Sequence, residues 1–191
     1  RGSRQGLKPM RKTVLYIALS LDGFIADSAG GVGWLHGHDP ALEEGSYGEF
    51  AATVDTAVMG RRTYDQVRGE LSPGAWPYEG MDCYVLTHRP ADGAPEGVTF
   101  TDEAPDKLLR RLRALPGRDI WICGGAETAM QLLRAGEIDV LRLSLIPTLL
   151  GGGRRLFGPL GREQRLRFLG CRAINGIAEL TYVREGAGND V

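Results

Sequence analysis

A pair of glycines lies where an apolar segment is followed by an amphipathic one, in the sequence CGGAET at residues 123–128. Glycine lets the backbone approach a ligand closely, and the free N–H groups at a helix start favour a bound anion. The motif predicts a phosphate site, and a tight strand-to-helix turn explains it equally well. Because the chain contains neither a GxGxxG fingerprint nor a GK[ST] loop, we do not expect an ordinary Rossmann or P-loop site.

A second transition of this kind is VMGRRTYDQV at residues 58–67, where Gly60 precedes Arg61, Arg62 and Thr63. Positive charges in the first turn of a helix oppose the helix dipole, so a bound anion would compensate for them. The alternative is that both arginines are solvated surface charges. We favour ligand contact, because two helix starts at one sheet edge suit a diphosphate.

Two further segments place polar or small residues at the end of an apolar run. In YVLTHRP, residues Thr87, His88 and Arg89 follow a predicted strand, and such strand ends face the ligand crevice in open α/β sheets. In YIALSLDGFIA, the small Ala18 leaves room for a flat ring against the strand. A polar strand exit and a packed core alanine are the structural alternatives for these two segments.

The elements that must position these residues alternate along the first two thirds of the chain. Short, nearly continuous apolar runs predict strands buried on both faces, at 13–19, 55–59, 82–87 and 119–123. Apolar residues at helical spacing predict helices at 42–52, 61–68, 104–114 and 125–135. This alternation favours βαβ units, with a mostly parallel sheet and helices on both of its faces.

The last third of the chain has a different pattern, because no helix is predicted between its strands. Those strands are expected at 138–147, 164–172 and 177–184. Asn175 and Gly176 are a strong signal for a two-residue hairpin turn. The predicted fold class is therefore α/β, with a mostly parallel central sheet that ends in a C-terminal antiparallel hairpin.

The composition is that of a globular protein, with 42% hydrophobic residues, 25% charged residues and a net charge of −1. Without a long basic block, nucleic-acid binding is not expected. No apolar run approaches the roughly 18 residues that span a bilayer, so we expect no membrane association and a cytoplasmic location. One domain is expected at 10–187, between an N-terminal remnant at 1–9 and a tail at 188–191.

The residues that bind metals most often are few and scattered. Cys83, Cys123 and Cys171 are an odd number and lie far apart, which predicts buried thiols in a reducing compartment. His36 and His38 lie close together, but the chain lacks the Cys/His spacing of a zinc site. No metal is therefore expected.

Taken in order, several segments resemble the dihydrofolate-reductase superfamily, and most closely the reductase domain of riboflavin biosynthesis with its stand-alone relatives. The match covers residues 13–184, and the segments that carry it are IALSLDGFIA, Trp34, VMGRRTYDQV, YVLTHRP, ICGGAET and SLIPTLLGGG. The resemblance implies a dihydrofolate-reductase-like three-layer fold and an NADPH cofactor.

The resemblance also implies which residues contact each part of NADPH. The backbone at Ala18 and the side chain of Ile25 would bracket the nicotinamide. The remaining positions are Gly124, Gly125, Ala126, Glu127 and Thr128 at the diphosphate, Gly60, Arg61, Arg62 and Thr63 at the diphosphate and 2′-phosphate, and Thr87, His88 and Arg89 at the adenosine end.

The substrate side departs from the family pattern. Folate reductases present one carboxylate from their first helix, whereas residues 34–50 here contain Asp39, Glu43, Glu44 and Glu49 at a different spacing. Asp39 and Glu49 are our candidate catalytic groups, because a carboxylic acid whose pKa is raised by burial can protonate a product. The candidate substrate-binding residues are Asp22, Trp34 and Ser144.

Together these features predict an NADPH-dependent oxidoreductase that transfers a hydride to a C=N or C=O group of a small heterocycle, of pteridine or ribosylated pyrimidine type. The alternative is a non-catalytic NADPH-binding sensor or assembly protein. The apolar run at 140–150, with the resemblance to dimeric reductases, predicts a homodimer joined partly through the C-terminal strands. Burial of that run within one subunit would explain it equally well.

Overall fold

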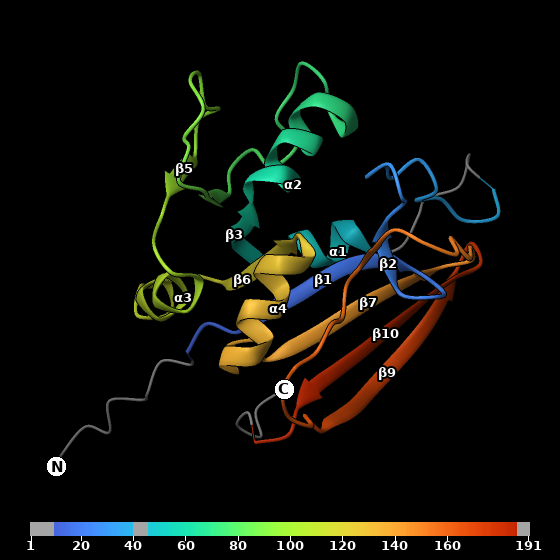
Figure 1. The fold of residues 1–191 in the computed structure, drawn as a ribbon. Helices are drawn as coiled ribbons and strands as arrows, with labels where there is room; N and C mark the ends of the chain where they lie inside the picture. The colour runs from blue at the N-terminus through green and yellow to red at the C-terminus, as the bar shows by residue number, and fades with distance from the viewer. Residues whose placement is uncertain (1–9, 40–45, 187–191) are drawn as a thin grey trace, which may run out of the picture.

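The computed structural model describes residues 10–39 and 46–186, and its strands form one large sheet and one small one (Figure 1). The strands of the large sheet are β1 (Thr13–Ser20), β3 (Val54–Gly60), β4 (Asp82–Leu86), β5 (Val98–Thr101), β6 (Asp119–Gly124), β7 (Val140–Ile146), β9 (Leu166–Ile174) and β10 (Ile177–Arg184). Their order across the sheet is β5-β4-β3-β6-β1-β7-β10-β9. The small sheet pairs β2 (Phe24–Ala26) with β8 (Arg154–Arg155).

The pairing within the large sheet changes from parallel to antiparallel at β7. From β5 to β7 all neighbouring strands run parallel, whereas β10 pairs antiparallel with both β7 and β9. This confirms the predicted fold class. The hairpin turn is also confirmed, since Asn175 and Gly176 have φ of 50° and 78°, as the favoured two-residue turns require.

Helices cover both faces of the sheet, and each face has its own hydrophobic core (Figure 1). Successive side chains of a strand point to opposite faces, so Val14 and Leu15 belong to different cores. Leu15 packs with α3 (Pro105–Arg113) and α4 (Ala126–Ala135), whereas Val14 packs with α1 (Tyr47–Ala51), α2 (Arg61–Gln66) and the π-helical turn η1 (Val67–Leu71). No helix in the described part of the chain has the length and hydrophobicity to cross a membrane.

The observed elements differ from the predicted ones mainly at short segments. The helix expected at 42–52 is described only as the five-residue α1, and residues 40–45 lie outside the described part. β2, β5 and β8 were not predicted, because strands of two to four residues carry too little periodicity to stand out. Cys171 is exposed, contrary to prediction, since it lies on the edge strand β9.

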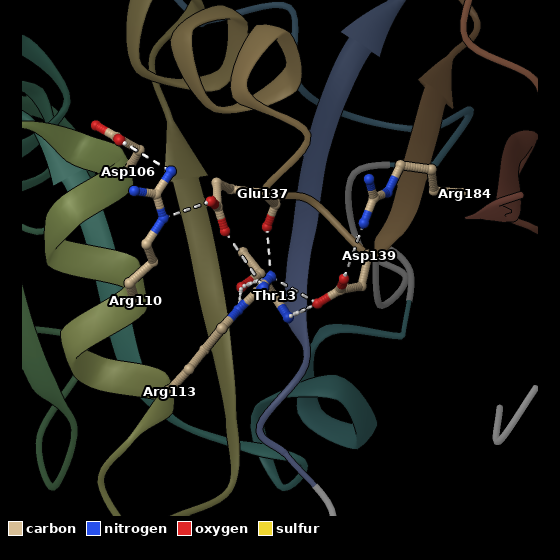
Figure 2. Close-up of polar contacts among 7 residues, drawn as sticks. All are labelled: Thr13, Asp106, Arg110, Arg113, Glu137, Asp139 and Arg184. Atoms are coloured by element: carbon tan, nitrogen blue, oxygen red, sulfur yellow. Dashed lines mark hydrogen bonds and ion pairs between the residues drawn. The ribbon is translucent and has the colours of Figure 1, made fainter. Parts of the chain in front are cut away.

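Arg113 is the centre of an ionic cluster at the amino ends of β1 and β7 (Figure 2). Its Nη2 donates to Thr13 Oγ1 at 2.8 Å, to the Glu137 carbonyl oxygen at 2.6 Å and to Asp139 Oδ2 at 2.8 Å. Asp139 Oδ2 also accepts the Thr13 N–H at 2.8 Å, and Arg110 pairs with Glu137 at 3.1 Å. These contacts join the end of α3 to the first residue of β1 and to the segment that enters β7.

The cluster predicts an unequal effect of two arginine substitutions on stability. The Arg113 side chain is 12% exposed, so Arg113→Ala leaves Glu137 and Asp139 without their main counter-charge. We expect a loss of about 3–5 kcal/mol in the free energy of unfolding, measured by urea denaturation at neutral pH. The matched control is Arg165→Ala, whose side chain is 78% exposed and should cost less than about 1 kcal/mol. Equal losses in the two variants would contradict this prediction.

Candidate functional site

Two strand-to-helix turns lie next to each other at the carboxyl edge of the parallel strands. β3 ends at Gly60, which precedes α2, and its neighbour β6 ends at Gly124, shortly before α4 begins at Ala126. Because β3 and β6 are parallel neighbours, both helices start at the same edge of the sheet. The predicted phosphate site lies at this edge, because free N–H groups at helix starts favour an anion.

The glycines of these turns permit a close approach that other residues would prevent. Gly124 has a φ of +114°, and a Cβ atom there would lie 3.2 Å from Ile17 Cδ1. A Cβ atom on Gly60 would lie 3.2 Å from Thr128 Oγ1, which belongs to the other turn. Both turns are therefore packed as closely as their backbones allow, which leaves backbone rather than side chains at the sheet edge.

Two adjoining cavities lie at this edge. The first has a volume of about 460 Å³ and is largely apolar, with Tyr47, Tyr78 and Trp121 in its lining. The second has a volume of about 770 Å³ and follows the starts of α2 and α4 and the exit of β4. Four residues line both cavities, namely Ile25, Thr63, Gln66 and Gly125. The two cavities together can hold an elongated ligand with a polar part and an apolar part.

The structure brings most of the predicted cofactor residues to these cavities. Those in the second cavity are Gly60, Arg61, Arg62, Thr63, Thr87, His88, Arg89, Gly125, Ala126, Glu127 and Thr128. Ala18 and Ile25 line the first cavity, as does Ser144, a predicted substrate residue. Gly124 lies in the turn behind the lining and shapes it through its backbone conformation.

The two arginines at the start of α2 have different roles. Arg61 Nε donates to the Asp65 carboxylate at 2.8 Å, and its guanidinium also donates to the Arg89 carbonyl oxygen. Its charge is therefore partly used within the protein, which neither ligand contact nor a solvated surface charge predicted. Arg62 is exposed in the second cavity and makes no polar side-chain contact with any residue that the structure describes. Arg62 is thus the better placed of the two to bind a phosphate.

Asp22 and Trp34, predicted to bind substrate, are instead engaged in holding loops. Asp22 accepts the Ser20 hydroxyl at 2.6 Å and the Leu150 and Gly151 N–H groups at 3.1 and 2.8 Å. The Ser20 hydrogen bond, with those from the backbone, lowers the pKa of Asp22 to about 2. Trp34 is buried with Ile146 and Ile177. Neither Asp22 nor Trp34 lines either of the two cavities.

The two predicted catalytic carboxylates also lie away from both cavities. Asp39 is exposed and exchanges backbone hydrogen bonds with the Asn175 side chain at 2.8 and 3.0 Å. Glu49 is on the solvent side of α1, where it pairs with Arg172 at 2.7 Å. Because neither residue contributes to the lining, their placement does not support the predicted catalytic role. The other carboxylates of this segment, Glu43 and Glu44, lie outside the described residues.

The carboxylate that the sequence reasoning missed is Glu179 on β10, which is 5% exposed. It accepts the Ser46 N–H at 3.0 Å and the Ser46 hydroxyl at 2.8 Å, and it accepts the Tyr16 hydroxyl at 3.2 Å. Burial raises the pKa of Glu179, but these hydrogen bonds and the Arg142 charge outweigh burial and hold the pKa below its ordinary value. The sequence signal that could have identified Glu179 is its position in the strand IAELTYVR, where an acidic residue occupies an inward-facing position.

Aromatic residues form much of the wall of the first cavity. The Trp121 ring centroid lies 5.7 Å from that of Tyr47 and 5.1 Å from that of Tyr78. Burial raises the pKa of Tyr47 to about 12, so its hydroxyl stays neutral at physiological pH. Within residues 10–39 and 46–186, no three His, Cys, Asp or Glu side chains gather as a metal site would require. The first cavity thus suits a flat, uncharged ring.

The chain is similar to known proteins over most of its length. The Bacillus subtilis (strain 168) protein YwjB is 41% identical over 174 residues, which cover 91% of this chain and 98% of YwjB. A putative riboflavin biosynthesis protein from Shewanella sp. PV-4 superposes with a TM-score of 0.80 at 29% identity, covering 91% of this chain and 99% of that one. Dihydrofolate reductase from Enterococcus faecalis, complexed with NADP(H), gives a TM-score of 0.62 at 19% identity, covering 91% and 96%.

These comparisons confirm the resemblance that the sequence motifs indicated. The similarity to dihydrofolate reductase shows a common fold. The family model of the RibD C-terminal domain matches residues 11–177, which include both glycine turns and most of the cavity lining. The chain therefore belongs to the RibD C-terminal domain family.

Proposed function

We propose that the chain is an NADPH-dependent oxidoreductase that reduces a small heterocycle of pteridine or ribosylated pyrimidine type. The observation that carries this proposal is the convergence of three separate segments on one elongated cavity. These segments are the start of α2, the exit of β4 and the start of α4. The first cavity, which is largely apolar, adjoins it, and a ring system fits there beside β1.

The residues present fit a dinucleotide cofactor. The close-packed turns at Gly60 and Gly124 offer backbone N–H groups to a diphosphate, and a Cβ atom on Gly60 would crowd the space between the two turns, 3.2 Å from Thr128 Oγ1. Thr63 and Gly125 line both cavities and would lie where the diphosphate meets the nicotinamide half. When bound, the cofactor supplies the hydride. The chain's own task is to position the rings, exclude water and bind the acceptor.

The relatives support the same proposal. The Enterococcus faecalis enzyme, which shares the fold, is a reductase complexed with NADP(H), and the Shewanella protein is described as a putative riboflavin biosynthesis protein. The alternative of a non-catalytic NADPH-binding sensor requires the same cofactor cavity. It differs in needing no substrate site, and the size of the apolar cavity favours the enzyme.

Hydride transfer can be tested with NADPH deuterated at the reducing carbon of its nicotinamide. We expect deuterium in the reduced product of a pteridine or a ribosylaminopyrimidine, detected by mass spectrometry. Gly124→Ala should lower turnover at least about tenfold, because it strains a backbone at positive φ beside Ile17. Gly158→Ala is the control, since open space surrounds that position. Tight NADPH binding without reduction of either class would favour the sensor.

Dihydrofolate should be a poor substrate. Asp39 and Glu49 belong to the segment that replaces the first helix of folate reductases. Neither residue lines either of the two cavities. We expect NADPH oxidation with dihydrofolate far below the median enzyme turnover of about 10 per second. Turnover near that median in a steady-state assay would show that another group in the cavity serves the folate ring.

NADPH should bind more tightly than NADH, because Arg62, His88 and Arg89 gather positive or protonatable groups in the second cavity. One charge-assisted hydrogen bond to the extra phosphate should favour NADPH by about ten- to a hundredfold. Arg62→Ala should remove most of this preference in isothermal titration, whereas Arg165→Ala on the distant surface should keep it. Equal affinities of the parent for both cofactors would contradict the assignment.

We also propose a homodimer, now on a different observation. The run at 140–150 that suggested it contains β7, which is covered by β1 and β10 within one subunit. Instead, the edge strand β9 exposes Leu166, Phe168 and Leu169, with Phe168 53% exposed. An exposed apolar edge strand is a template for pairing with another copy.

Sedimentation velocity at micromolar concentration tests this proposal. We expect a species of twice the 20.7 kDa mass of the chain. Phe168→Lys should shift it to the monomer, because a charge would be buried at the β9 edge. Leu115→Lys, at an exposed leucine outside β9, should leave the dimer intact. A parent protein that sediments as a monomer would remove the proposal.

A further inference from the structure

We propose that Glu179 orients the hydroxyl groups of Tyr16 and Ser144 as hydrogen-bond acceptors toward the first cavity, so that this cavity selects a planar heterocycle carrying an N–H donor. The inference rests on the proposed function, because it concerns the substrate side of the same site. It assigns Glu179 as a positioning residue that acts through two side chains of the cavity wall.

The register of the sheet places these groups together. Ser144 on β7 lies opposite Ala18 on β1 and opposite Glu179 on β10. Tyr16 precedes Ala18 by two residues, so both point to the same face of β1. Tyr16, Ala18 and Ser144 line the cavity, whereas Glu179 lies behind them with 5% of its surface exposed.

The carboxylate of Glu179 has hydrogen-bond donors around both oxygens. Oε1 accepts the Ser46 N–H at 3.0 Å and the Tyr16 hydroxyl at 3.2 Å, and it lies 3.5 Å from the Ser144 hydroxyl. Oε2 accepts the Ser46 hydroxyl at 2.8 Å. Three of these donors converge on Oε1 and one on Oε2, so most of the acceptor positions of Glu179 are used within the protein. It therefore acts on a ligand through its neighbours and does not need to contact the ligand itself.

An ionised carboxylate fixes the direction of these hydrogen bonds. A hydroxyl group has one proton to donate, and an ionised carboxylate only accepts. The Tyr16 hydroxyl therefore donates its proton to Glu179 Oε1. The Ser144 hydroxyl has two acceptors within the protein, Glu179 Oε1 and the Tyr16 oxygen. The positive charge of Arg142 favours the ionised form of Glu179. The Arg142 guanidinium donates to Ser46 Oγ at 2.7 Å and lies 5.2 Å from the centre of the Tyr16 ring.

Because both protons point inward, the lone pairs on the Tyr16 and Ser144 oxygens that these contacts do not use remain for the cavity. A ligand N–H group would donate a hydrogen bond to these lone pairs. A carbonyl oxygen or an unprotonated ring nitrogen of the ligand is itself an acceptor and could form no hydrogen bond with them. The rest of the wall is mostly apolar, and Tyr47, Tyr78 and Trp121 pack there with tilted and edge-to-face rings. In such a cavity a few directed polar groups determine which edge of a ring binds.

Two heterocycles of the same shape test the inference without turnover. 2-Aminoquinazoline carries an N–H donor where 2-methylquinazoline carries a methyl group, and both are titrated calorimetrically into the cofactor-free protein. We expect the parent to bind the amino compound about tenfold more tightly, the effect of one hydrogen bond to an otherwise unsatisfied polar group.

Three variants distinguish the orientation of the two hydroxyl groups from a general change in the shape of the cavity. The double variant Tyr16→Phe with Ser144→Ala should bring the affinity ratio close to one, and Glu179→Gln should lower it as well, because the charge that orients both protons is lost. Ser72→Ala removes a hydroxyl from another part of the lining and should keep the ratio. The ratio of two affinities is informative because a general loosening of the cavity weakens both ligands alike. If Glu179→Gln does not fold, the double variant, which retains Glu179, carries the test.

Equal affinities in the parent, or a preference that survives the double variant, would overturn the inference. Failure of both heterocycles to bind at millimolar concentration would overturn it too, because the cavity would then not accept a planar ring. NADPH is titrated into the same samples as a separate measurement. If the parent binds NADPH but binds the amino and methyl compounds equally, only this inference is rejected. If the parent does not bind NADPH, the proposed function is rejected.

Discussion

The hydrogen bonds of Arg113 to Thr13 and Asp139 hold together the elements on which the rest of the structure depends. They fasten α3 to the amino ends of β1 and β7, two central strands of the sheet. Since the parallel strands all run the same way, fixing their amino ends leaves their carboxyl ends to form the two cavities. The ionic cluster of Arg113 and the two cavities thus lie at opposite edges of one sheet.

The sequence was sufficient for the parts of the fold that local patterns determine. Apolar runs gave β1, β3, β4 and β6, and the glycines at 60, 124 and 125 marked the turns that bring α2 and α4 to one edge. β5 was missed because four residues at the sheet edge carry little signal, although its partner β4 makes it a regular strand. The pairing of Arg61 with Asp65 was not predicted, although the two residues are four positions apart on a helix.

The substrate side was harder to predict, because its polar groups come together only through strand pairing. Asp39 and Glu49 were proposed from their position in the sequence, yet both point to solvent. Glu179 follows the expected site by more than a hundred residues and reaches it because β10 pairs with β7 in the register that sets Glu179 opposite Ser144. The strand pattern could mark Glu179 as an inward position, but no local periodicity indicates which residues of two distant strands face each other, so its place beside Ser144 followed only from the sheet pairing.

The use of backbone in one cavity and of side chains in the other has an evolutionary consequence. The second cavity owes part of its shape to two closely packed turns: a Cβ atom on Gly60 or Gly124 would lie 3.2 Å from a neighbouring side chain, and Gly124 has a positive φ, so substitution at these two positions is restricted. The wall of the first cavity consists of side chains such as Tyr47, Tyr78 and Ser144, which can be exchanged without moving a strand. Related domains can therefore diverge in a few side chains of the first cavity while they inherit the same glycine turns beside the second.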